Sequence, residues 1–273
     1  MENLISDTEL VLLLRDIHDN YGYDFSEYAK ASLLRRVKRL FALDRFTSFA
    51  EFRYHLKSDS NYLKRFVEEI TVNVTEMFRD NSFFNTLRTE VLPVLSTYPF
   101  IRIWHAGCSS GEEVYSMAIL LEEAGILNKS IVYATDINPN VLQNASKGIF
   151  PLSKMKQYSE SYIASGGQRE FSYYYRANYE NALFIEELKE KIVFATHNLV
   201  SDKTFNEFQL ILCRNVMIYF EKELQDKVLL LFNNSLDQLG FLALGLKETI
   251  RFSPLANSFR IFNYKDRIWR KIA

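Results

Sequence analysis

The chain has 273 residues, of which 48% are hydrophobic and 25% charged, and its formal net charge is −1. This composition is typical of globular proteins and excludes collagen-like and disordered chains. The length favours two domains, and the near-neutral charge argues against a dedicated nucleic-acid-binding protein.

Targeting and redox features predict a cytoplasmic protein. Residues 1–10 hold no basic cluster ahead of an apolar run, which a secretory signal would show. No apolar stretch reaches the roughly 18 residues that cross a bilayer. The two cysteines, Cys108 and Cys213, are too few for a disulfide framework and lack the paired spacing of a zinc site. We therefore expect a reducing compartment, no membrane insertion and no metal.

Residues 1–70 are predicted to form an all-α domain, because apolar residues recur at helical spacing from Ser6 to Ile70. Between Tyr28 and Phe66, ten Lys or Arg stand against three Asp or Glu. In the helix with the apolar stripe Leu33, Leu34, Val37 and Phe41, the basic residues fall opposite that stripe and should be exposed; they are Arg35, Arg36, Lys38 and Arg39. Such a face either binds an acidic partner or is simply solvated.

Residues 71–80 are predicted to be a linker, because the run from Thr71 to Thr75 is rich in β-branched residues and suits extended chain. A helix should follow from about Asn81, capped by Asp80 and ending near Pro93.

Residues 81–273 are predicted to form an α/β domain with a mostly parallel, Rossmann-like sheet, because short apolar runs alternate with helices. The predicted strands are 101–106, 131–135, 192–196, 208–213 and 241–245, with two more between Phe259 and Ile272. Residues of about 148–190 do not fit this alternation and predict an inserted β subdomain, with candidate strands at 171–175 and 182–185.

A glycine loop, Gly107-Cys108-Ser109-Ser110-Gly111, follows the first strand of this domain. Ligands bind at such strand ends in open α/β sheets. The spacing is not the G-x-G-x-x-G of a pyrophosphate site. Glu112 and Glu113 begin the next helix, where they either complement the helix dipole or attract a cation. S-adenosylmethionine has no phosphate and carries an ammonium and a sulfonium, so it fits this loop.

Asp136 ends the second strand of the domain. A carboxylate at this place can accept hydrogen bonds from both ribose hydroxyls of a nucleoside. The alternative is that Asp136 caps the helix that begins near Pro139. Loop and carboxylate together indicate a nucleoside-like ligand.

Two further runs, NVTEMFR at 73–79 and ILCRNVMIYF at 211–220, are highly unusual. With GCSSGEE at 107–113 and His197-Asn198-Leu199, they resemble the chemotaxis receptor methyltransferases, the CheR family, along nearly the whole chain. The resemblance implies a methyltransferase that uses S-adenosylmethionine, releases S-adenosylhomocysteine and methylates glutamate side chains on cytoplasmic chemoreceptor helices in chemosensory adaptation. We expect a monomer without nucleic acid.

The resemblance also implies roles for individual residues. The expected cofactor contacts are Asn73, Thr75, Arg79, Glu113, Asp136, Asn198, Leu199, Arg214 and Asn215. Arg79 and Tyr219 are the residues implied to lie nearest the transferred methyl. The basic helix with Arg35, Arg36, Lys38 and Arg39 is implied to contact the receptor. The inserted β subdomain resembles the one that docks a receptor peptide in some members, but it departs from the short glycine-rich version.

The chemistry of glutamate fits these roles. A glutamate carboxylate, with a pKa of about 4.3, is already ionised at neutral pH and needs no general base. The four histidines, His18, His55, His105 and His197, are accordingly interpreted as structural. The enzyme must supply placement, which is worth about 7 kcal/mol or more. Arg79 is expected to orient a carboxylate, and we favour that of the cofactor over that of the substrate.

Two alternatives stay open at this point. The basic helix also suits a methyltransferase that acts on nucleic acid or a small molecule, whose nucleic-acid binding would depend strongly on salt. The second alternative is a non-catalytic signalling module with a degenerate methyltransferase fold, which would not bind S-adenosylmethionine.

Overall fold

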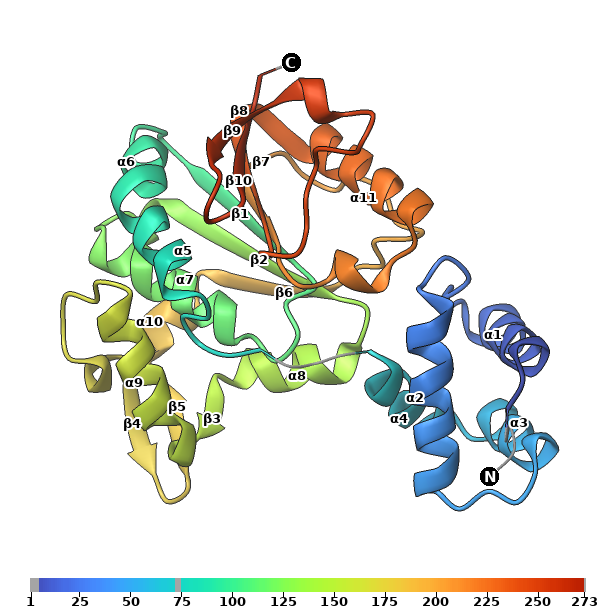
Figure 1. Cartoon of the computed structure of the whole chain (residues 1–273). Coiled ribbons are helices and arrows are strands. Elements are labelled where there is room, and N and C mark those ends of the chain that lie inside the picture. The colour runs from blue at the N-terminus through green and yellow to red at the C-terminus, as the bar shows by residue number, and fades with distance from the viewer. Residues whose placement is uncertain (1–4, 72–74, 273) are drawn as a thin grey trace. The chain divides into compact units, whose positions relative to one another are not determined.

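The computed structural model describes residues 5–71 and 75–272 (Figure 1). The described chain forms two compact units. The first contains the residues before 72 together with Met217–Val228, and the second contains the others. Asn73, one of the predicted cofactor residues, lies outside the described residues.

Within the described residues 5–71, the first unit contains the helices α1 (Asp7–Tyr21), α2 (Lys30–Leu43), α3 (Phe49–Ser58) and α4 (Ser60–Ile70). Ser6 and Glu9 form a capping box that satisfies backbone donors at the start of α1. Gly22 ends that helix with φ +77°, a conformation that favours glycine. Each helix buries one apolar stripe, so the unit has its own hydrophobic core.

Met217–Val228 belongs to this all-α unit although it follows the second unit's strand β7 (Phe208–Cys213) in the chain. Phe220 forms an antiparallel bridge with Tyr28. On either side, Ala29 N donates to Tyr219 O at 2.9 Å, and Glu221 N donates to Glu27 O at 3.0 Å. The segment continues into α11 (Lys222–Ser235). Sequence patterns did not predict this pairing, because nothing local marks it.

The second unit is built on a seven-stranded sheet in the order β6-β2-β1-β7-β8-β10-β9. Besides β7, its strands are β1 (Ile101–Ala106), β2 (Ser130–Asp136), β6 (Ile192–Thr196), β8 (Leu236–Leu244), β9 (Phe259–Asn263) and β10 (Ile268–Lys271). The pairs from β6 to β8 are parallel, whereas β10 runs antiparallel to both β8 and β9. Helices separate β1 from β2 and β7 from β8, as the predicted alternation requires, whereas β6 and β7 follow one another without a helix between them.

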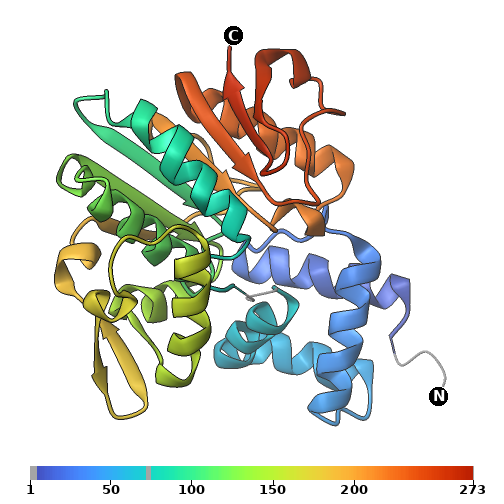
Figure 2. The same ribbon diagram turned by 60° about the vertical axis from the view of Figure 1, so that its left-hand side comes forward.

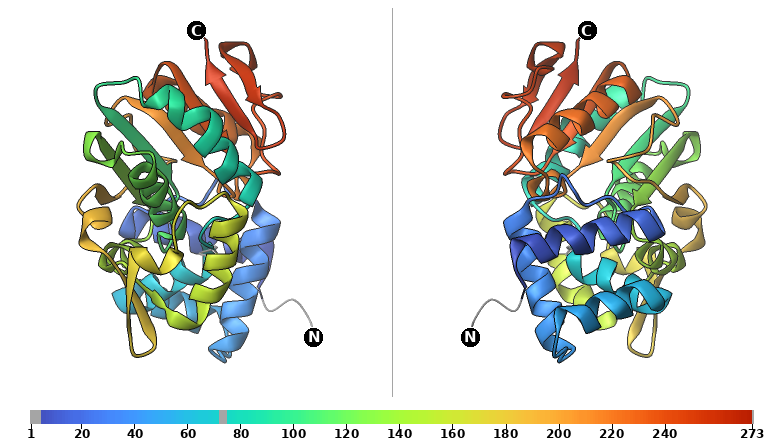
Figure 3. Two further views of the ribbon diagram at one scale, coloured as in Figure 1. Left: turned by 90° about the vertical axis from the view of Figure 1, so that its left-hand side faces the viewer. Right: turned by 90° about the vertical axis from the view of Figure 1, so that its right-hand side faces the viewer.

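Helices cover both faces of this sheet (Figure 3). On one face lie α5 (Asn81–Thr86), a π-helical turn (Leu87–Val91), α6 (Leu92–Leu95) and α7 (Glu112–Glu123), whose apolar side chains share a core with Ile101 and Ile103. On the other face, Trp104 packs edge-on against Phe232 of α11. Each such buried side chain contributes about 1.5–3 kcal/mol. Because both faces are covered, β7 is buried at all six positions.

The inserted β subdomain lies between α8 (Pro139–Lys147) and β6. It contains a three-stranded antiparallel sheet in the order β3-β5-β4, formed by Ile149–Pro151, Asn181–Phe184 and Tyr175–Asn178, with helices α9 (Met155–Ala164) and α10 (Glu186–Lys189) (Figures 1 and 2). The Tyr115 ring of α7 meets the Phe150 ring edge-on and the Phe184 ring at a tilt, each at 5.3 Å between ring centroids. These aromatic contacts fasten the subdomain to the main core.

The predicted fold class is confirmed: an all-α part precedes a Rossmann-like α/β sheet with a small β insertion. Two local expectations about these elements are wrong. Phe171–Tyr174, predicted as part of a strand, forms a 3-10 helical turn, and β4 begins only at Tyr175. Asp80 precedes α5 but makes no side-chain hydrogen bond to that helix, and its backbone is left-handed at φ 61°. Its carboxylate pairs with Arg214 instead. No helix within the described ranges is long and apolar enough to cross a membrane.

Candidate functional site

Several of the predicted cofactor residues lie at the carboxyl ends of neighbouring strands of the main sheet. Strands β6, β2, β1 and β7 are neighbours and run parallel, so their carboxyl ends meet. The glycine loop follows β1, Asp136 ends β2, and Arg214 directly follows β7. Beyond β6, the backbone N–H of His197 donates to Asp136 O at 3.1 Å and places Asn198 one residue away. Ligands of open α/β folds bind at such an edge.

Asp136 is buried, with 8% of its surface exposed. One carboxylate oxygen accepts from Ser109 N at 2.9 Å and the other from Asn138 N at 3.0 Å. Burial raises the pKa of this carboxyl, against the opposing effect of these backbone donors. Asn138, not Asp136, caps α8 by accepting from Asn140 N at 2.9 Å. Each Asp136 oxygen keeps a second lone pair, which suits ribose hydroxyls.

The glycine loop turns sharply because its two glycines have positive φ, +80° at Gly107 and +91° at Gly111. A Cβ atom at Gly107 would lie 2.5 Å from Val216 Cγ2, so the loop and the segment after β7 approach too closely for any other residue. Between the glycines, Ser109 also has positive φ, at 52°. The loop backbone is thereby held close to Asp136.

Glu113 lies at the centre of a charged cluster. One carboxylate oxygen accepts from Arg214 at 2.7 Å and the other lies 3.1 Å from His105 Nδ1. A second guanidinium nitrogen of Arg214 donates to Asp80 at 2.6 Å. Burial alone would raise the pKa of Glu113, but the charge of Arg214 and the contact with His105 lower it to about 2.

The charges of this cluster leave an excess of negative charge. Glu113 and Asp80 together carry −2 and Arg214 carries +1, so these three side chains sum to −1, and a neutral His105 adds no charge. Arg214, with 1% of its side chain exposed, also lies 3.8 Å from the centre of the Phe83 ring. Its position is therefore fixed by two carboxylates and an aromatic face. A net negative site favours a cationic ligand and disfavours a phosphate.

Glu248 completes the site from the carboxyl end of β8. Its two oxygens accept three backbone donors, from Gly245 at 2.5 Å, Asn215 at 2.9 Å and Val216 at 3.0 Å. The carboxylate is buried, with 5% of the residue exposed. It holds Asn215 in a left-handed conformation, at φ 61°. Left-handed backbone at a residue other than glycine is uncommon and often marks functional sites.

The remaining predicted residues are placed as follows. Thr75 and Arg79 are half-buried in the segment before Asp80, and Asn198 and Leu199 are half-buried after β6. Asn198 accepts from Val200 N at 2.9 Å in a tight turn. Tyr219 and the four basic residues of α2 belong to the other compact unit. Of those four, Arg35 and Arg39 are exposed as predicted, whereas the predicted exposure is wrong for Arg36 and Lys38, which are half-buried.

Sequence reasoning missed three residues of the site: Asp80, His105 and Glu248. Asp80 was interpreted as a helix cap and His105 as structural. For Glu248 a signal was present, since it follows a predicted strand by three residues, at the edge where ligands bind. His105 gave none, because its contact with Glu113 depends on how β1 packs against α7.

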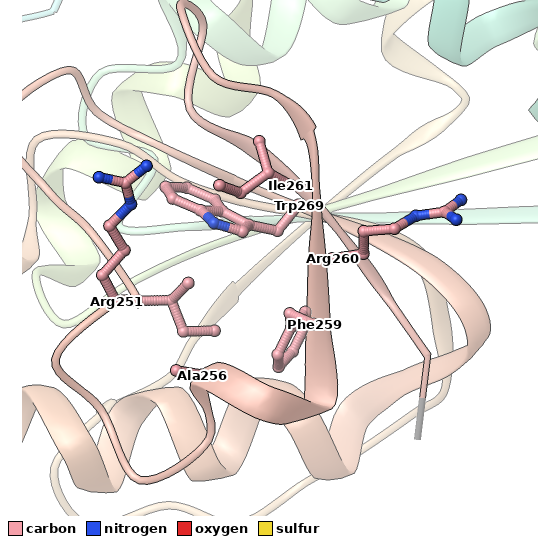
Figure 4. A pocket seen from close by; sticks show the side chains of 7 residues that line it. Arg251, Ala256, Phe259, Arg260, Ile261 and Trp269 are labelled. Carbon is pink, nitrogen blue, oxygen red and sulfur yellow. The ribbon is translucent and has the colours of Figure 1, made fainter.

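An apolar hollow of about 370 Å³ lies elsewhere, between the loop after β8 and the hairpin β9–β10. Phe259, Ile261 and Trp269 line it, with Arg251 at its side (Figure 4). None of its lining residues belongs to the site at the strand ends. Among the described residues, no group of His, Cys, Asp or Glu could hold a metal ion.

This arrangement defines a class of protein: an α/β fold whose strand ends carry a buried carboxylate that suits ribose hydroxyls and a cluster of carboxylates that suits a cationic nucleoside. S-adenosylmethionine, which has a ribose, an ammonium and a sulfonium, fits these residues. The class is that of S-adenosylmethionine-dependent methyltransferases.

Comparison with known proteins specifies the family. The CheR methyltransferase SAM binding domain matches residues 73–266, and the CheR methyltransferase all-alpha domain matches residues 8–71. The chain therefore belongs to the CheR methyltransferase family.

Curated relatives match along almost their whole length. "Putative methyltransferase Cher3" of Pseudomonas putida is 45% identical over 97% of both chains. The "Chemotaxis protein methyltransferase" of Borreliella burgdorferi is 32% identical over 90% of both chains. The protein of the same name from Salmonella typhimurium is 31% identical, over 94% of this chain and 88% of that one.

Proposed function

We propose that the protein transfers a methyl group from S-adenosylmethionine to glutamate side chains of chemoreceptors. The observation that supports this most is the match to both CheR domains, over 8–71 and 73–266, together with relatives named chemotaxis protein methyltransferases. The acceptor in this proposal is a glutamate on the cytoplasmic helices of a receptor.

The residues at the strand ends would hold the cofactor. Asp136 suits the ribose hydroxyls, and the net negative cluster around Glu113 suits the ammonium group. Thr75, Arg79, Asn198, Leu199 and Asn215 are proposed as further contacts. When bound, S-adenosylmethionine supplies a methyl group activated by its sulfonium, and transfer to a glutamate oxygen leaves a methyl ester and S-adenosylhomocysteine.

The acceptor needs little chemical help from the protein. Glutamate is ionised at neutral pH, with a pKa of about 4.3, so its oxygen is already a nucleophile. The protein's task is to align that oxygen with the methyl carbon and to exclude water. Arg79 and Tyr219 are proposed to lie nearest the transferred methyl.

The receptor would be recognised by charge. Helices that present several glutamates are acidic, and Arg35 and Arg39 are exposed on α2. Complementary charges of this kind mainly accelerate encounter and set specificity. Arg35 and Arg39 are therefore the proposed receptor contacts on α2, with Lys38 beside them.

Methyl-labelled S-adenosylmethionine and a purified receptor cytoplasmic fragment test this proposal. We expect label that base releases as methanol, because methyl esters hydrolyse in base, and no label when the target glutamates of the fragment are replaced by alanine. Asp136→Ala should abolish the labelling by weakening cofactor binding. Base-stable label, or label that persists after those glutamates are replaced, would show that the acceptor is a different group.

A further inference from the structure

Arg36 differs from the other basic residues of α2. Arg35 and Arg39 are exposed to solvent, whereas Arg36 is half-buried. Its guanidinium carbon lies 4.7 Å from the centre of the Tyr219 ring, over the ring face. Both residues belong to the first compact unit, because Met217–Val228 is part of that unit.

Hydrogen bonds hold the Arg36 guanidinium in this place. One terminal nitrogen donates to the backbone oxygen of Ile70 at the end of α4, and the other donates to Ser32 Oγ at 3.1 Å, one turn earlier on α2. A planar guanidinium can donate in its plane while its face rests on an aromatic ring. These two hydrogen bonds and the ring contact orient the guanidinium toward partners within its own unit.

The backbone of Tyr219 is fixed from the same unit. Tyr219 O accepts from Ala29 N at 2.9 Å, and the neighbouring Phe220 ring meets the Tyr28 ring at 4.9 Å between centroids. Lys227 and Glu27 add an ion pair at 2.5 Å. With the backbone held, two side-chain torsions decide where the phenol of Tyr219 points. Contact with the Arg36 face restricts both.

We propose that Arg36 is a positioning residue that fixes the ring of Tyr219, and that it does not bind the receptor. This inference rests on the proposed function, in which Tyr219 lies near the transferred methyl. Helix α2 then has two roles. Arg35 and Arg39 contact the receptor, whereas Arg36 contacts the ring of Tyr219.

A double-mutant cycle tests the assignment. Arg36→Gln should lower kcat about tenfold, the scale expected when a reacting group is slightly misplaced, and should change KM little. Arg35→Gln, one residue away on the same helix, should instead raise KM and leave kcat nearly as it is. In a Tyr219→Phe background, Arg36→Gln should lower kcat no further, because the hydroxyl that it positioned is gone.

Two further variants test how the Arg36 guanidinium affects kcat. Arg36→Lys keeps the charge but loses the planar fork, so kcat should stay well below that of the wild type. Ser32→Ala removes one anchor of the guanidinium and should lower kcat less than Arg36→Gln does. Equal thermal midpoints and S-adenosylmethionine affinities show that the variants are folded.

Fluorine NMR gives a readout that does not depend on activity. In protein labelled with 3-fluorotyrosine, the Tyr219 signal among the 16 tyrosines is assigned by its loss in Tyr219→Phe. Arg36→Gln should shift or broaden that signal, and Arg35→Gln should leave it unchanged. This measurement decides the contact even if Arg36→Gln lowers the stability of the protein.

Three outcomes would overturn the inference: an unchanged Tyr219 signal in Arg36→Gln, losses of kcat that multiply independently in the cycle, or a rise in KM like that of Arg35→Gln. Failure of the proposed function would give a different pair of results. Wild type would then form no base-labile ester on the receptor fragment, while the fluorine signal of Tyr219 would still respond to Arg36.

Discussion

Arginine serves the two compact units in opposite ways. On α2 of the first unit, Arg35 and Arg39 are exposed and their charge faces solvent. At the strand ends of the second unit, Arg214 has 1% of its side chain exposed and bridges two carboxylates. The exposed cations are free to meet a partner, whereas the buried one organises its neighbours. Buried, paired charges and exposed charges should therefore have different consequences when they are replaced, and four experiments measure that difference.

The largest effect is expected from Arg214→Ala. This change leaves Glu113 and Asp80 without their shared cation, and breaking a buried ion pair in this way costs about 3–5 kcal/mol. The free energy of unfolding, measured in urea, should fall by that amount. Arg35→Ala is the matched control and should stay within about 0.5 kcal/mol of the wild type. Similar losses in both variants would contradict the comparison.

A somewhat smaller effect on the free energy of unfolding is expected when Glu113 is protonated at low pH. Its folded-state pKa, about 2, lies below its ordinary value, so its ionised form stabilises the folded state. That stabilisation is fully present above the unfolded-state pKa of about 4.3 and is lost as pH falls through about 2. The gap in unfolding free energy between wild type and Glu113→Gln should therefore shrink as pH falls from about 5 to 2. A gap that does not change with pH would show that Glu113 is not held ionised.

Glu248→Gln should cost about 1–3 kcal/mol, because an amide nitrogen then faces one of the three backbone donors that the carboxylate satisfies. Since these donors set the conformation of Asn215, the Kd for S-adenosylmethionine should rise as well. Denaturation in urea and calorimetric titration measure the two effects. Exposed Glu223→Gln, at the start of α11, is the control and should change neither.

The smallest effect on stability is expected from Arg39→Gln, within about 0.5 kcal/mol. Its effect should appear in receptor methylation, as a KM that rises a few-fold and a rate that depends less on salt, because an exposed charge acts through screened attraction. Methylation rates from 50 to 300 mM NaCl would check this. If the methylation rate of Arg39→Gln depends on salt as strongly as that of the wild type, Arg39 does not contact the receptor.

Local patterns in the sequence predict much of the fold and part of the site. The strands at 101–106, 192–196 and 208–213 are found at those positions, because short apolar runs leave few alternatives. Asp136 and Arg214 could be placed at strand ends for the same reason. Asp80 could not be assigned correctly, since a carboxylate before a helix normally caps it. Its actual partner, Arg214, lies 134 residues further along the chain.

The sequence by itself determined the chemistry available to this protein: the glycines that permit the loop after β1, the carboxylates that suit a cationic nucleoside, and the motifs that mark the CheR family. Tertiary structure alone decided which charges are neutralised and which are offered to a partner. Arg36 and Arg35 are adjacent and chemically identical, yet one rests on Tyr219 and the other faces solvent. The physical reason is that burial and pairing depend on residues distant in the chain, which local periodicity does not report.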